Sequence, residues 1–226
     1  EHFPNGGGGY VVATHTISNQ AGVISGSALL VDYVLTIAIS LASCGDAIFS
    51  FLPTVLLHYK MFFVTGLIFL LVLLNLRGLK ESVTFLAPIF ILFVITHILL
   101  IGYGLGTHLG EIGPVMEKYR GSMNLDLSTI GLLGITAIFL RAFSLGGGTY
   151  TGIEAVSNAM GVMREPRVET GKRTMLYLAI SLALTASGLL FCYALFSITP
   201  VEGRTMNAIL ADRTFSGWPM GGVLAF

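Results

Sequence analysis

The chain has 226 residues, of which 54% are hydrophobic and only 11% are charged, and its mean hydropathy is +0.83. Soluble domains carry about 25% charged residues, so this chain has too few charges to cover a water-facing surface, and lipid must be the solvent for much of it. Twelve basic residues balance twelve acidic ones, which excludes the basic surface expected of a nucleic-acid-binding protein.

The N-terminal stretch is rich in glycine, with Gly6–Gly9 lying between Asn5 and Tyr10. A phosphate-binding loop ends in Gly-Lys-Ser or Gly-Lys-Thr. This stretch does not, so we expect no nucleotide site here. At the other end, residues 221–226 open a further apolar stretch. We therefore expect the chain to be an internal part of a longer protein.

Five segments are apolar enough to cross a membrane, for which a helix needs about 20 mostly apolar residues. The predicted spans are residues 23–52, 61–76, 83–105, 130–159 and 174–198. No low-complexity linker divides them. The sequence therefore predicts an all-α polytopic membrane protein, with one transmembrane transporter domain over residues 1–226.

The connections between the spans differ in charge. The link at 77–82 is short and basic, and the link at 160–173 carries four basic residues. The positive-inside rule places both links in the cytoplasm of a multi-pass plasma-membrane protein. The connection that contains Lys118 and Arg120 is expected to be a long loop on the other side.

Asp32 lies in the middle of the first span. A carboxylate there costs about 2.5–3.5 kcal/mol unless it has a partner or a wet cavity. Thr36 and Ser40 follow at i+4 and i+8, so all three side chains share one face of the helix. Hard cations prefer oxygen ligands, so this stripe indicates a cation path. The alternative is a helix-packing face, in which small hydroxyl residues lie between helices.

The fourth span is interrupted by three successive glycines, Gly146–Gly148, and the sequence continues to Tyr150, Thr151 and Glu154. Glycine weakens a helix by about 1 kcal/mol per residue. Non-helical backbone at membrane depth must line protein or a cavity, and broken helices are how many secondary transporters build their substrate sites. We therefore predict a discontinuous helix around 146–150, with Thr151 and Glu154 opening the second half. The alternative is that the glycines only permit close helix packing.

Four stretches then show a resemblance to a known superfamily. They are Phe3-Pro4-Asn5-Gly6-Gly7-Gly8-Gly9-Tyr10, Asp32-Tyr33, Thr151-Gly152-Ile153-Glu154 and Arg164-Glu165-Pro166-Arg167. In their order and spacing they resemble the amino acid–polyamine–organocation (APC) superfamily along nearly the whole chain. The resemblance implies a partial LeuT-type bundle, in which the five spans match transmembrane helices three to seven.

Within the superfamily, the chain is most similar to the KUP-type potassium transporters, in particular the KimA-like branch, whose members take up K⁺ with protons. The resemblance implies that Asp32, Thr36 and Ser40 approach the ions from the third helix. Thr151 and Glu154 match a Thr-Gly-Val-Glu-type sequence in the sixth helix, with isoleucine in place of valine.

The leading hypothesis is therefore proton-coupled potassium uptake, with Glu154 as the coupling carboxylate. The residues expected to bind K⁺ are Asp32, Thr36, Ser40, Thr151 and Glu154, with Tyr150 as a further substrate contact. The alternative is an amino acid permease of the same fold, in which the broken span binds a backbone ammonium or carboxylate.

Neither a nucleophile–base pair nor a metal-ligand set is visible in the sequence, so we expect no enzyme, and no cofactor beyond the transported K⁺ and H⁺. The expected partners are the lipid bilayer and a small cation or amino acid, with a homodimer as a further option and no nucleic acid.

Overall fold

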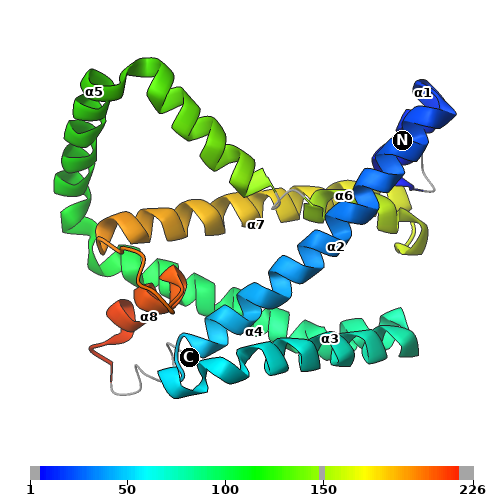
Figure 1. Ribbon diagram of the computed structural model, residues 1–226, viewed down its shortest axis with the longest axis horizontal. Coiled ribbons are helices and arrows are strands. Elements are labelled where there is room, and N and C mark those ends of the chain that lie inside the picture. The colour runs from blue at the N-terminus through cyan, green and yellow to red at the C-terminus, as the bar shows by residue number, and fades with distance from the viewer. Residues whose placement is uncertain (1–5, 148–150, 219–226) are drawn as a thin grey trace. The chain divides into compact units, whose positions relative to one another are not determined.

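The computed structural model describes residues 6–147 and 151–218, without the side chains of residues 79–81 and 151. Within these ranges the chain forms helices and no β-strand, as the composition predicts (Figure 1). The α-helices are α1 (Gly8–Thr16), α2 (Asn19–Phe49), α3 (Lys60–Arg77), α4 (Leu79–Thr107), α5 (Ile112–Gly146), α6 (Thr151–Asn158), α7 (Arg167–Leu195) and α8 (Met206–Phe215). Short 3₁₀ helices lie at Thr54–Tyr59, Leu109–Glu111 and Ala159–Val162.

Five helical segments are long and apolar enough to cross a membrane. They are Asn19–Phe49, Thr54–Arg77, Ser82–Thr107, Leu109–Gly146 and Arg167–Leu195. At most 6% of the residues in their most apolar windows are buried within the described part of the chain. Lipid or further protein must therefore cover these apolar faces, because water would not stabilise them.

The predicted break in the fourth span is confirmed. Helix α5 ends at Gly146 and helix α6 begins at Thr151. The expected loop around Lys118 and Arg120 is wrong, because helix α5 already begins at Ile112. This segment contains good helix formers such as methionine, glutamate and lysine. Its proline, Pro114, stands in the first turn, where the missing N–H would have no helical partner.

Helix α5 contains a second interruption that sequence analysis did not identify. Gly131 has φ 69° and ψ 176°, which is outside the helical region. Only glycine adopts this backbone conformation at little cost. The charged first part of α5 and its apolar second part are therefore joined at a glycine that breaks the helix.

The described residues group into two compact units, and each is considered by itself. The first unit comprises the residues up to 38 and residues 121–184, and the second comprises residues 39–120 and those from 185 onward. Helices α2, α5 and α7 contribute residues to both units. That the chain forms one transporter domain stays a prediction.

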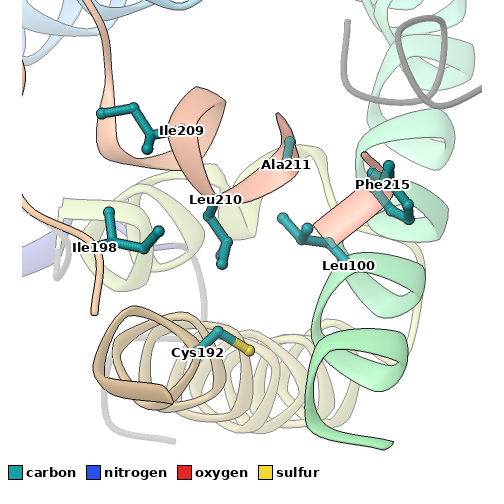
Figure 2. Packing of buried hydrophobic residues seen from close by; sticks show 7 residues of the cluster. All are labelled: Leu100, Cys192, Ile198, Ile209, Leu210, Ala211 and Phe215. Carbon is teal, nitrogen blue, oxygen red and sulfur yellow. The ribbon is translucent and has the colours of Figure 1, made fainter. Parts of the chain in front are cut away.

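The second unit contains a buried cluster in which α8 packs on α4 and α7. Figure 2 shows Leu210 of α8 pointing toward Cys192 of α7 and Leu100 of α4, and the first two of these residues are fully buried. Thr205 caps the N-terminus of helix α8. Its side chain accepts a hydrogen bond from the backbone N–H of Ala208 at 3.2 Å. The cap and the apolar contacts together fix α8 on the spans.

Candidate substrate site

The predicted oxygen stripe lies on α2, which is helical without interruption from Asn19 to Phe49. Asp32 and Thr36 are half-buried and belong to the first unit. Ser40 is exposed and belongs to the second unit. Within the first unit, the spacing of four residues keeps Asp32 and Thr36 on one face of the helix. That Ser40 joins them stays a prediction.

The predicted residues around the break are described only in part. Tyr150 lies outside the described residues, and of Thr151 only the backbone is described, as the first residue of α6. Glu154 lies in the first turn of α6 and is half-buried.

No residue in the described ranges forms an ion pair with Glu154. The ion pairs there involve other acidic residues, for example Asp46 with Lys60 at 2.6 Å. A carboxylate within a membrane-spanning bundle requires a counter-charge, a proton or water. That Glu154 takes up a cation or a proton stays a prediction.

Helix α1 contacts both α2 and α6, and at Gly8 and Gly22 the approach is so close that an added methyl group would overlap its neighbour. A methyl group on Gly9 would lie 3.7 Å from Oε1 of Glu154 and 3.9 Å from Oγ of Ser25. On α2, a methyl group at Gly22 would meet Thr14 of α1, and one at Gly26 would meet Tyr10. The Gly22-x-x-x-Gly26 spacing is a common device for close helix packing in membranes.

A hydrogen bond joins α2 to α6 directly beside the two predicted carboxylates. The side-chain amide of Asn158 donates a hydrogen bond from Nδ2 to the hydroxyl oxygen of Tyr33, with 2.5 Å between the two atoms. Tyr33 follows Asp32, and Asn158 lies one turn after Glu154. The structure therefore brings together the parts of α2 and α6 that carry the two carboxylates.

Sequence analysis missed Tyr33, Asn158 and Ser25 as members of this site. The available signal for Asn158 was its spacing, since it lies four residues after Glu154 and so on the same helical face. The glycine stretch at Gly6–Gly9 also indicated a close backbone approach. Nothing local indicated which residues it would approach.

Comparison with known proteins identifies the family. A family model described as amino acid permease matches residues 1–223. The chain belongs to this family. Its membership confirms the predicted APC superfamily and the partial helical bundle. It also agrees with the expectation that the chain is not an enzyme, because the proteins it matches are transporters.

One curated relative has a more specific name. The chain is 34% identical over 215 residues to the potassium transporter KimA of Bacillus subtilis (strain 168). The match covers 94% of this chain and 34% of KimA, so the chain spans about a third of that relative's length. The family and the five apolar helices together make this amino acid permease family member a multi-pass membrane protein.

Proposed function

We propose that the full-length protein is a secondary transporter that takes up K⁺ together with protons. The observation that carries the proposal is the placement of Asp32 and Glu154 on α2 and α6, two helices of the first unit that are joined by the hydrogen bond between Tyr33 and Asn158. Two carboxylates within membrane spans fit a cationic substrate better than a neutral one. The name of the relative KimA, a potassium transporter, supports this substrate.

In this proposal the α2 stripe and the start of α6 supply oxygen ligands to a dehydrated K⁺. The ligands are Asp32, Thr36, Ser40, Thr151 and Glu154, with Tyr150 as a further contact. Glu154 binds and releases the coupled proton, because it forms no ion pair within the described residues. Alternating access moves the broken span relative to α2 and α3, with the links at 77–82 and 160–173 in the cytoplasm.

The test is K⁺ uptake into proteoliposomes by the full-length protein carrying Asp32→Asn. This change removes the charge and keeps the size, so we expect uptake to be abolished. A matched control is Asp46→Asn on the same helix, because Asp46 is exposed and paired with Lys60. Uptake by the Asp32→Asn variant at the wild-type rate would refute the ion path.

Proton coupling has its own test. We expect wild-type uptake to acidify the vesicle lumen in step with K⁺ entry, and Glu154→Gln to abolish this pH change because glutamine cannot exchange a proton. A pH-sensitive dye inside the vesicles measures the change. Potassium entry without any proton movement in the wild-type protein would rule out coupling.

An amino acid permease is the second candidate, and it is favoured by the matched family model. In this case the break between α5 and α6 binds the backbone ammonium or carboxylate of an amino acid, and Asp32 is structural. Thermal stabilisation of the purified full-length protein separates the two candidates. Stabilisation by K⁺ and by no amino acid supports potassium transport. Stabilisation by an amino acid and not by K⁺ supports the permease.

A homodimer stays a prediction, which the mass of the purified protein in detergent will test.

A further inference from the structure

We propose that Asn158 and Tyr33 form a positioning pair that holds α6, and with it Glu154, at a fixed distance from Asp32 on α2. The inference rests on the proposed function, since it concerns the same site. Neither residue is proposed as a ligand. Their role is to set the geometry of the two carboxylates between which the substrate binds.

The first step is the position of the pair along the two helices. Asn158 lies four residues after Glu154 on α6, so the two side chains lie on the same face about 6 Å apart along the axis, at about 1.5 Å per residue. Tyr33 directly follows Asp32 on α2. The hydrogen bond of 2.5 Å between them therefore fixes the two helices within about one turn of both carboxylates.

The second step is the need for such a contact. Helix α6 follows the break after Gly146 and has only eight residues. A helix of this length is only marginally stable by itself. Tertiary contacts must position α6, and the amide of Asn158 makes the side-chain hydrogen bond to α2.

The third step is the packing of the amide itself. A methyl group at Gly8 would lie 2.3 Å from Oδ1 and 3.1 Å from Cγ of Asn158, so the backbone of α1 lies directly on the amide. Oδ1 is buried and has no hydrogen-bond partner among the described residues. The bond from Nδ2 to Tyr33 is thus the polar contact that orients this amide. Removal of the Tyr33 hydroxyl leaves the half-buried amide without a hydrogen-bond partner among the described residues, which is more costly than the loss of one exposed bond.

The experiment is a double-mutant cycle in the full-length protein, with Tyr33→Phe, Asn158→Leu and both changes together. Potassium uptake into proteoliposomes gives the KM for K⁺ and the maximal rate. Interhelical hydrogen bonds in membranes have measured strengths that correspond to about threefold to fifteenfold in an equilibrium constant. We expect each single change to raise the KM by about that factor with a maximal rate within twofold of the wild type, and we expect the double change to have the same KM as the singles. A general loss of folding would instead lower the maximal rate at unchanged KM.

The matched control is Tyr177→Phe. Tyr177 also lies in a spanning helix, α7, but its side chain is 68% exposed. The KM of this variant for K⁺ should equal that of the wild type. A KM within twofold of the wild type for Tyr33→Phe overturns the pair, and so does a double variant whose KM change is the product of the single changes. If Asn158→Leu does not fold, the comparison of Tyr33→Phe with Tyr177→Phe decides. A wild-type protein that takes up no K⁺ refutes the proposed substrate instead, and the same cycle is then measured with the amino acid that stabilises the protein.

Discussion

The packing of α1 on α6 can be tested at Gly8. This residue has φ +57°, and a methyl group there would lie 2.3 Å from Oδ1 of Asn158. Gly8→Ala therefore imposes two separate costs, a left-handed backbone conformation and an overlap with a buried amide. The backbone cost arises at Gly8 itself, and the overlap acts on the contact between α1 and α6.

The magnitudes of these costs can be estimated separately. A left-handed conformation costs a residue with a Cβ about 1–2 kcal/mol. The overlap moves the Asn158 amide off the hydroxyl of Tyr33, and an unpaired buried polar group costs about 1–3 kcal/mol. We therefore expect Gly8→Ala to lower the free energy of unfolding by about 2–5 kcal/mol.

Two other glycines separate the contributions. Gly203 has φ +76° and nothing within 4 Å of an added methyl group, so Gly203→Ala should show the backbone cost alone. Gly66 lies inside helix α3, also with nothing within 4 Å, so Gly66→Ala should be neutral or stabilising by up to about 1 kcal/mol. The assay is equilibrium unfolding of the full-length protein in mixed micelles. If Gly8→Ala costs no more than Gly203→Ala, the close contact with Asn158 does not exist.

Two further changes test the packing of each unit. Leu210→Ala, in the buried cluster that α8 forms with α4 and α7, should lower the free energy of unfolding by about 2–5 kcal/mol, because Leu210 is fully buried. The control is Leu133→Ala, at a position that is 88% exposed. An equal effect of the two changes would contradict the cluster. Gly22→Ala should destabilise the protein by about 1–3 kcal/mol, because its methyl group would lie 1.9 Å from Oγ1 of Thr14. Thermal unfolding measures both, and a more stable Gly22→Ala variant would exclude close contact between α1 and α2.

Features that follow from local sequence were predictable. The break between α5 and α6 was predicted because consecutive glycines weaken a helix. The row formed by Asp32 and Thr36 was predicted because helical periodicity fixes which residues share a face. By contrast, the charges of Lys118 and Arg120 were interpreted as a loop, although a charged helix outside the membrane is equally compatible with them.

Contacts between distant segments were not predictable from one sequence. Tyr33 and Asn158 are 125 residues apart, and no local pattern pairs them. The contacts of the glycine stretch with Asn158 and Glu154 depend on how α1 packs in three dimensions.

The interruption at Gly131 limits how much membrane the fourth span can cross. The charged first part of α5 contains Asp126 and is unsuited to hydrocarbon. The part after Gly131 has about 15 residues, which at about 1.5 Å per residue reach roughly 22 Å, less than the roughly 30 Å of a bilayer core. A helix that starts at one membrane surface and is this short ends before it reaches the other surface. In a bilayer the end of α5 at Gly146 would therefore lie short of the far surface, so that the polar backbone groups there must find their hydrogen-bond partners within the protein.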